Sequence, residues 1–233
     1  MEDPFEASAA AYLRQQAEIY GMELPLDGKL IKNPLTTSNG PSAKDLESFY
    51  NEIKDCQLCP LGATRTKFVF GVGNPNADLM LIGEAPGRNE DLQGEPFVGR
   101  AGQLLDKILA AINLSREEVY IANVLKCRPP NNRDPLKSES DTCQPYLKQQ
   151  IELIKPKLIL ALGRVSGSWL LGEDLALKDM RNNFYSYNGI EMMVTYHPAA
   201  LLRNPHWKRP CWEDMQRVRD RLAITTKGTH VNA

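Results

Sequence analysis

Four of the five cysteines have a spacing that could bind a metal ion or an iron–sulfur cluster. Cys56 and Cys59 form a Cys-x2-Cys pair. Cys127 and Cys143 follow much later and are separated by fifteen residues. Four thiolates suit either a tetrahedral zinc ion or a cubane cluster. Zinc sites usually show two close pairs, so the wide second pair and the prolines beside the cysteines favour a cluster. A chance pairing of buried thiols stays open, and Cys211, which has no partner in the pattern, is expected to be a structural thiol.

A second set of polar and turn-forming residues follows four short apolar runs. The runs cover residues 78–83, 119–124, 157–163 and 191–196. None of them alternates cleanly between apolar and polar residues, which is typical of strands covered on both faces. Helical stretches are expected at residues 100–113, 138–154 and 210–223. Alternating strands and helices predict an α/β fold, with a mostly parallel sheet between two layers of helices.

The residues directly after these strands are the candidates for a binding site, because ligands on such sheets bind beyond the carboxyl ends of the strands. Polar or turn-forming residues stand at all four places, and together they predict one composite pocket. They are Gly83–Gly87, Asn123 with Lys126–Pro130, Gly163–Arg164 and His197–Pro198.

Composition neither supports nor excludes a nucleic-acid partner. The chain has 233 residues, 42% hydrophobic and 24% charged, which is ordinary for a globular protein, and its formal net charge is −1. A DNA-binding surface would therefore need its positive charge gathered in a local groove. No apolar run approaches the roughly 18–20 residues that span a bilayer, and the N-terminus lacks a signal-peptide pattern. We expect a cytoplasmic protein with reduced thiols and no membrane contact.

The chain is expected to have one main domain with two short extensions. Residues 1–42 read as an N-terminal extension, with a short helix at 5–20 followed by a linker rich in Pro, Gly, Ser, Asn and Thr. Residues 43–225 form the main domain, and 226–233 a flexible C-terminal tail.

The sequence resembles the family 4 uracil-DNA glycosylases over about residues 43–215. Three runs carry the resemblance: CPLGATRTKFVFGVGNPNADLMLIGEAPGRNEDLQGEPFVGRAGQLLD, NVLKCRPPNNRDP and YHPAALLRNP. The resemblance implies a three-layer α/β/α sandwich around a four-stranded parallel sheet. It also implies a 4Fe–4S cluster bound by Cys56, Cys59, Cys127 and Cys143. The substrate would be uracil-containing DNA, single- or double-stranded, and we expect a monomeric, monofunctional enzyme of base excision repair.

Ala85 and the loop after the second strand separate this chain from two related branches. The best-known glycosylases of the superfamily have, where this chain has Ala85, an aspartate that positions the attacking water. A covalently trapping branch has a Gly-Glu-Gln-Pro-Gly motif and a histidine-bearing basic loop. This chain has Cys-Arg-Pro-Pro-Asn-Asn instead, so turnover without a suicide adduct is expected.

If the chain excises uracil, several of these residues would each have a distinct role. The amide of Asn123 could pair with O4 and N3–H of uracil and so discriminate against cytosine. Phe97 would stack on the flipped base. His197 would donate a hydrogen bond to O2 of the departing uracil anion.

Leu201, Leu202 and Arg203 would form a wedge that enters the emptied base stack. Gly83, Glu84 and Ala85 would line the uracil pocket. Glu84 and Glu90 are also candidate catalytic carboxylates, with Glu90 near the sugar, where it could orient water or stabilise a sugar cation.

Three alternatives remain at this point. The first is an electron-transfer or structural cluster module within a nucleic-acid assembly. The second is a zinc-stabilised DNA-binding domain without catalysis. Neither explains why Asn123, Phe97 and His197 should meet at one edge of the sheet. The third is a glycosylase with a broader base specificity that includes hypoxanthine or xanthine.

Overall fold

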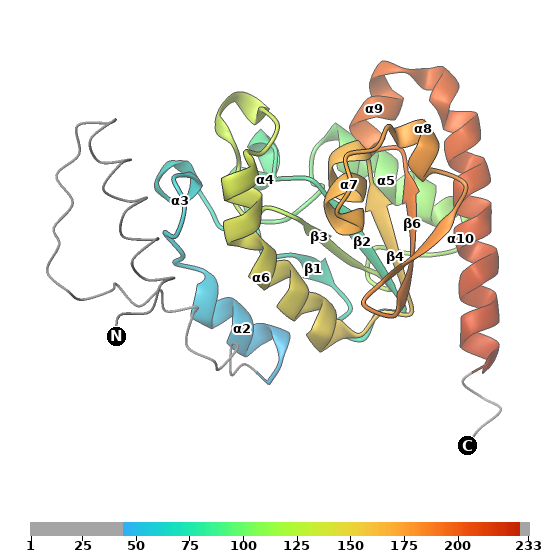
Figure 1. The fold of residues 1–233 in the computed structure, drawn as a ribbon, viewed down its shortest axis with the longest axis horizontal. Helices are drawn as coiled ribbons and strands as arrows, with labels where there is room; N and C mark the ends of the chain where they lie inside the picture. Colours follow the sequence, from blue (N-terminus) through green and yellow to red (C-terminus); the bar gives the residue numbers. More distant parts are fainter. Residues whose placement is uncertain (1–43, 229–233) are drawn as a thin grey trace, which may run out of the picture. The chain divides into compact units, whose positions relative to one another are not determined.

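Six strands form one sheet in the part of the chain that the computed structural model describes, residues 44–228. Their order across the sheet is β1-β3-β2-β4-β6-β5. The four central strands run parallel, and each edge strand is antiparallel to its neighbour (Figure 1). The strands are β1 (Val72–Gly73), β2 (Leu79–Gly83), β3 (Tyr120–Asn123), β4 (Leu158–Leu162), β5 (Phe184–Tyr187) and β6 (Ile190–Thr195).

The four central strands are the four apolar runs predicted from the sequence, so the α/β fold class is confirmed. The sheet is wider than predicted, because β1 and β5 add a strand at each edge. β1 has only two residues, and β5 is not fully buried. Neither strand therefore has the continuous apolar run that marks the central four.

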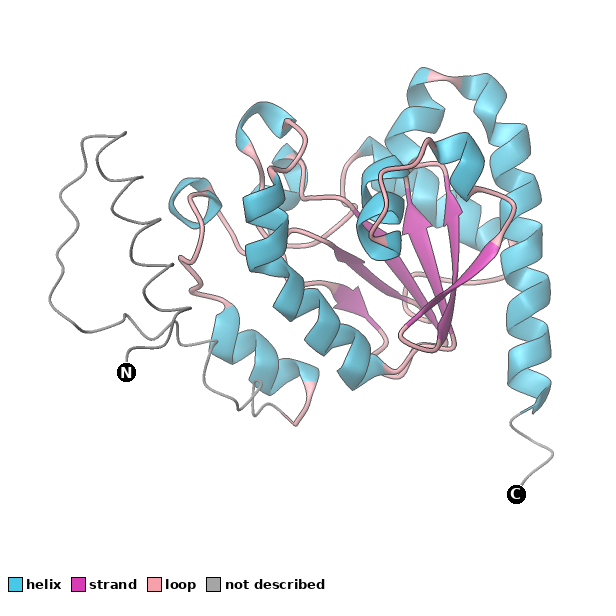
Figure 2. Cartoon of the chain, viewed as in Figure 1, coloured by secondary structure: helices cyan, strands magenta, loops and turns pink. Residues whose placement is uncertain are grey.

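Helices lie in the connections between the successive parallel strands, whereas loops alone join β1 to β2 and β5 to β6 (Figure 2). None within residues 44–228 is long and apolar enough to cross a membrane. The helix expected at 5–20 lies outside the described residues. The last helix, α10, is longer than expected. The α-helices are α2 (Leu46–Ile53), α3 (Leu61–Thr64), α4 (Arg88–Gln93), α5 (Arg100–Ala111), α6 (Lys137–Ile154), α7 (Arg164–Leu171), α8 (Leu177–Met180), α9 (Pro198–Arg203) and α10 (Lys208–Gly228), with single 3-10 turns η1 (Pro130–Asn132) and η2 (Pro205–Trp207).

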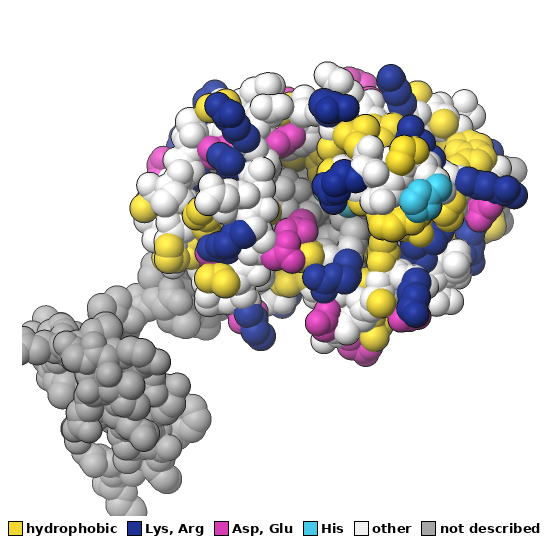
Figure 3. All heavy atoms as spheres, turned by 90° about the horizontal axis from the view of Figure 1, so that it is seen from above, with side chains coloured by type: hydrophobic (Ala, Val, Ile, Leu, Met, Phe, Trp, Pro, Cys, Tyr) yellow, Lys and Arg dark blue, Asp and Glu magenta, His cyan; other side chains and the backbone are white. Residues whose placement is uncertain are grey.

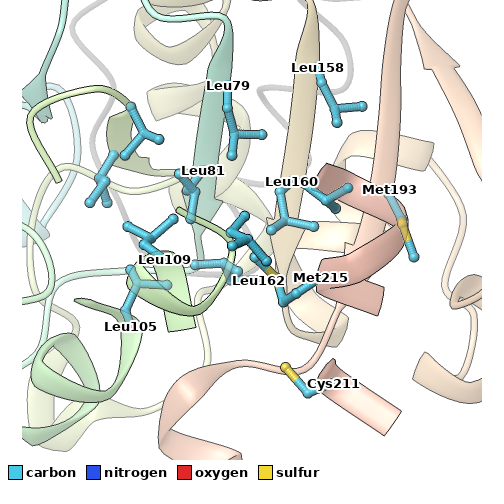
Figure 4. Close-up of a cluster of buried hydrophobic side chains, with 14 of the residues drawn as sticks. Leu79, Leu81, Leu105, Leu109, Leu158, Leu160, Leu162, Met193, Cys211 and Met215 are labelled. Carbon is cyan, nitrogen blue, oxygen red and sulfur yellow. The ribbon is translucent and has the colours of Figure 1, made fainter. Parts of the chain in front are cut away.

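One face of the sheet packs against α5, α9 and α10. Side chains alternate between the faces of a strand, so Leu79 and Leu81 of β2 point to this side. They meet the apolar stripe of α5, and Leu201 of α9 and Met215 of α10 belong to the same cluster (Figure 4). This layer places the start of α9 beside the end of β6.

The opposite face packs against α6, α7 and α8. Met80 and Ile82 of β2 point to this side and belong to one buried cluster with Leu147 of α6, Leu170 of α7 and Met180 of α8. The two clusters give the three-layer arrangement that the sequence predicts.

A third buried cluster lies beneath α2 and contains two of the four candidate ligand cysteines. Asp45 caps α2 by accepting a hydrogen bond from the Ser48 N–H at 2.8 Å, and the helix buries Phe49. Cys127 and Cys143 are buried in this cluster, and Cys56 and Cys59 pack against it. The fold therefore brings all four cysteines to one region.

Candidate active site

A cavity of about 560 Å³ opens at the carboxyl end of the parallel strands. Each parallel strand contributes to its wall at or just after its last residue, as the sequence predicts. The contributing residues are Glu84 after β2, Asn123 in β3, Gly163 after β4 and His197 after β6. Ala85, Glu90, Phe97 and Arg203 also line it.

The amide of Asn123 lines this cavity with one hydrogen-bonding atom unused. Its side chain is buried, and no group within residues 44–228 donates a hydrogen bond to its Oδ1 atom. A buried polar atom without a partner costs about 1–3 kcal/mol. The backbone oxygen of the same residue is held by the Lys126 ammonium at 2.9 Å. Asn123 is thus fixed through its backbone and has a free acceptor for a ligand.

The side chains of Asn123 and Phe97 both lie close to the backbone of Gly83. A side chain at this position would collide with the Asn123 amide oxygen and with the Phe97 ring, whose Cζ would lie 2.7 Å from the added carbon. Gly83 therefore contributes to the pocket by having no side chain.

Phe97 is held in a left-handed backbone conformation, with φ of 55°, which non-glycine residues adopt rarely. Glu90 fixes the residues that follow, since its Oε1 atom accepts hydrogen bonds from Val98 N–H at 3.0 Å and Gly99 N–H at 3.1 Å. Gly102 lies directly beneath, where any side chain would collide with the Phe97 carbonyl. These contacts hold the Phe97 ring in the pocket.

His197 is fixed in one tautomer by the start of α9. Its Nδ1 atom accepts a hydrogen bond from Ala199 N–H at 3.1 Å, so the neutral ring carries its proton on Nε2. Burial lowers the pKa of His197 to about 4; the Arg203 cation lowers it further and Glu90 partly opposes the shift. At neutral pH the imidazole is therefore an uncharged N–H donor. Its ring stacks on Phe97, with centroids 5.3 Å apart and planes inclined by 29°.

Glu84 is an acid whose environment favours the protonated form. Burial raises the pKa of Glu84 to about 7, the nearby Asp134 carboxylate adds to the rise, and the Arg164 cation opposes it. A carboxyl that titrates near neutral pH in a pocket is a candidate for proton transfer. Ala85, the next residue, supplies only a methyl group to the wall and also packs against the cysteine-bearing cluster.

The three residues expected to form a wedge differ in exposure. Leu201 is 1% exposed and packs in the core beneath α9, whereas Leu202 is 38% exposed. Arg203 is exposed at the end of the same helix and lines the cavity. Only Leu202 and Arg203 therefore have side chains available to a partner in this conformation.

Three arginines and three acidic residues, Glu84, Glu90 and Asp134, line the cavity of this chain, whose net charge is −1. Arg133, Arg164 and Arg203 line its wall. Figure 3 views this edge of the sheet and shows Lys and Arg side chains around a hollow, with acidic side chains beside them. Arg164 pairs with Asp174 at 2.9 Å and lies 3.8 Å from Asp134. The acidic residues offset much of the charge of the arginines, which are the groups of the wall that could contact a phosphate backbone.

Three of the four cysteines, Cys56, Cys127 and Cys143, have hydrogen-bond donors aimed at their sulfur atoms. Arg65 donates to Cys127 Sγ at 3.2 Å, and Tyr146 donates its hydroxyl to Cys56 Sγ at 3.1 Å. The backbone N–H of Lys126 lies 3.4 Å from Cys143 Sγ, and that of Leu58 lies 3.5 Å from Cys56 Sγ. Hydrogen bonds to sulfur are a feature of iron–sulfur sites, where they tune the reduction potential. Within residues 44–228, no three His, Cys, Asp or Glu side chains are placed to bind a single metal ion.

Sequence reasoning missed Arg65 and Tyr146, which help to hold this arrangement together. Arg65 lies 62 positions from Cys127 and Tyr146 lies 90 positions from Cys56, so no local spacing reveals these contacts. Lys126 was expected among the residues of the pocket, but it does not line the cavity. It is fully buried and joins the Asn123 carbonyl to Gln150 Oε1, the latter at 2.5 Å.

Among sequence models of protein families, that of the uracil DNA glycosylase superfamily matches residues 70–216. This range includes the whole wall of the cavity described above and two of the four cysteines.

Three relatives named type-4 uracil-DNA glycosylase align with most of this chain. The protein of Sulfurisphaera tokodaii is 46% identical over 191 residues, covering 78% of this chain and 86% of its own. That of Archaeoglobus fulgidus is 42% identical over 183 residues, covering 75% and 92%. That of Thermotoga maritima is 40% identical over 178 residues, covering 75% and 93%. The chain therefore belongs to the uracil DNA glycosylase superfamily, within its type-4 group.

Proposed function

We propose that this chain is a uracil-DNA glycosylase, which flips uracil out of DNA and hydrolyses its N-glycosidic bond to begin base excision repair. The observation that carries the proposal is the unpaired Asn123 Oδ1 atom in a pocket that also contains an uncharged histidine donor. Relatives with this activity in their names, 40–46% identical over most of the chain, support it.

Asn123 would select the base. Its Oδ1 atom would accept N3–H of uracil, and its amide N–H would donate to O4. Cytosine presents the opposite pattern at both atoms and would leave the buried amide unpaired. Phe97 would stack on the flipped ring, as aromatic side chains do for unstacked bases.

His197 would stabilise the leaving group. As the glycosidic bond breaks, negative charge develops on uracil O2, and a preorganised Nε2–H donor gains strength with that charge. The bond from Ala199 N–H to Nδ1 supports this role, because it keeps the proton on Nε2. A neutral donor also leaves the His197 ring itself uncharged before the reaction.

The two carboxyls would have separate tasks. Glu90 has already committed Oε1 to two backbone N–H groups, which supports a role in positioning Phe97. Glu84, with its pKa raised to about 7, is the stronger candidate for handling a proton of the attacking water, in the absence of an acid at position 85. The product would be free uracil and an intact abasic strand.

Leu202 would be the tip of the wedge, supported from below by the buried Leu201 and flanked by Arg203. An apolar side chain pushed between base steps compensates for the space left by the extruded nucleotide. The arginines around the cavity would hold the adjacent phosphates.

The four cysteines would bind a 4Fe–4S cluster. A cubane bonds each thiolate to a different iron, so its ligands stand further apart than those of a single ion, and the N–H and O–H donors aimed at the sulfurs suit it. When bound, the cluster would cross-link the segment before β1, the loop after β3 and α6. We place the catalytic domain at residues 43–225 and expect a monomer acting inside the cell.

Excision assays with purified protein test this proposal. Oligonucleotides with a single uracil, hypoxanthine, mismatched thymine or, at the same position, cytosine would be incubated with the wild type, with Asn123→Ala and with the surface control Asn51→Ala. We expect uracil release by the wild type and the control, and a loss of rate and of preference over cytosine in Asn123→Ala. Borohydride should trap no adduct, because no amine nucleophile is invoked. Hypoxanthine release without uracil release would overturn the assigned base.

A further inference from the structure

The segment from Tyr196 to Pro210 leaves the sheet after β6 and returns at the start of α10. We call it the 196–210 loop. It contains His197, all of α9 with Leu202, and η2. Two groups with different proposed tasks, leaving-group stabilisation and base-stack insertion, thus share one excursion of the chain.

Arg181, at the end of α8, contacts both ends of this loop. Its Nη1 atom donates to the Tyr196 hydroxyl at 3.0 Å, and its Nη2 atom donates to the Pro210 carbonyl at 2.9 Å. The guanidinium also lies over the Tyr196 ring, 4.4 Å from its centroid. One side chain therefore closes the base of the loop.

Asp214 of α10 fixes Arg181 in turn. The two form a bidentate pair, Nε to Oδ2 at 2.8 Å and Nη2 to Oδ1 at 3.0 Å. Asp214 is fully buried and Arg181 is 8% exposed. Asp214 Oδ2 also accepts the Thr195 hydroxyl at 2.6 Å, which anchors the last residue of β6.

A buried ion pair of this kind is better explained by the orientation that it imposes on its side chains than by a contribution to the free energy of unfolding. The cost of removing both charges from water often cancels their attraction, and apolar replacements of the pair are frequently neutral or stabilising. The pair does fix the orientation of the Arg181 side chain, because a planar guanidinium that is hydrogen-bonded on several edges has little freedom to rotate. The Tyr196 ring that it holds stacks on Trp207 in η2, with centroids 5.2 Å apart, so the constraint extends into the loop.

We propose that Arg181, held by Asp214, is a positioning residue that sets the 196–210 loop for work on double-stranded DNA. This inference rests on the proposed roles of His197 and Leu202. In a duplex the loop must place Leu202 in the stack while His197 meets the extruded base, so the two ends of the loop have to be fixed together. In a single strand the base is already accessible, and the demand on the loop is smaller.

The test compares excision of uracil from duplex and single-stranded oligonucleotides under single-turnover conditions. The variants are Arg181→Lys and the charge-free double replacement Arg181→Met with Asp214→Leu, which keeps the site filled. The control is Lys157→Met, which breaks the Lys157–Asp78 ion pair at the amino ends of the central strands β2 and β4. A fluorescent base analogue beside the uracil reports extrusion directly.

We expect the double variant to lose roughly tenfold or more in duplex rate relative to single-strand rate, with a weaker extrusion signal, since small misplacements of reacting groups are costly. Arg181→Lys should lie between it and the wild type, and Lys157→Met should keep the wild-type ratio. Equal losses on both substrates, or no loss, would overturn the inference. A wild type that releases no uracil from either substrate would instead refute the proposed function, so the two failures are distinguishable. If Arg181→Lys does not fold, the double variant alone decides.

Discussion

The Oε1 atom of Glu90 accepts the backbone N–H of Gly99 at 3.1 Å, and Gly99 is the N-cap residue of helix α5. This carboxylate therefore anchors a helix start and, through Val98, the strained backbone of Phe97. Glu90 could be taken for a residue that activates water. One of its two carboxylate oxygens, however, already accepts two hydrogen bonds from the backbone.

Two substitutions of Glu90 separate positioning from water activation. Glu90→Gln keeps an acceptor oxygen for Val98 N–H and Gly99 N–H, so it should retain most of the single-turnover rate. Glu90→Ala removes the anchor and should slow excision by roughly 10²-fold, as expected when a reacting partner is misplaced by about 1 Å. If both variants are equally impaired, the negative charge is what matters and the positioning role is wrong.

Replacement of His197 should affect chemistry far more than binding. His197→Ala should slow single-turnover excision by roughly 10²–10³-fold, since it removes a donor aimed at developing charge. Affinity for uracil-containing DNA should change little, because phosphate contacts supply most of it. His206→Ala, at an exposed histidine of η2, is the matched control. Near wild-type excision by His197→Ala would make this histidine structural.

The pH dependence of stability should carry a contribution from Glu84. Folding raises the pKa of this carboxyl from 4.5 to about 7, chiefly by burial, so the folded state holds the proton more tightly. The free energy of unfolding should therefore fall as pH rises between these values, where the unfolded state has already released the proton. Urea titrations at several pH values should show this decline in the wild type and a smaller one in Glu84→Gln. The exposed Glu173→Gln should behave as the wild type.

The cysteines predict a coloured protein. The wild type should absorb broadly near roughly 400 nm, as thiolate-bound iron–sulfur centres do, and should contain iron. Cys127→Ser should lose colour and solubility, whereas Cys211→Ala should keep its colour, because Cys211 belongs to α10 and is buried in a different cluster from the other four. Zinc without iron in the wild type would refute the cluster.

The sequence was sufficient to predict the central sheet and the residues at its carboxyl edge. Buried parallel strands require continuous apolar runs, and the ends of such strands meet at one edge, so the places of Asn123 and His197 follow from the apolar runs that precede them. The edge strands could not be predicted in the same way, since β1 is two residues long and β5 is partly exposed.

The supporting contacts of the site could not be predicted either. Arg65 reaches Cys127 across 62 positions of the chain, and Arg181 reaches Asp214 across 33. Such pairs depend on how whole elements pack, and no local pattern records them. The burial of Leu201 beside the exposed Leu202 likewise depends on how α9 sits on α5.

The unpaired oxygen of Asn123 also has a consequence for lesions that resemble the substrate. An N3-methylated uracil keeps both carbonyl oxygens and the shape of the ring but has lost the proton that this oxygen needs. Its methyl group would face a desolvated lone pair in a space bounded by Gly83 and Phe97. We therefore expect that this pocket does not bind a uracil alkylated at N3. A different repair route would have to remove that base.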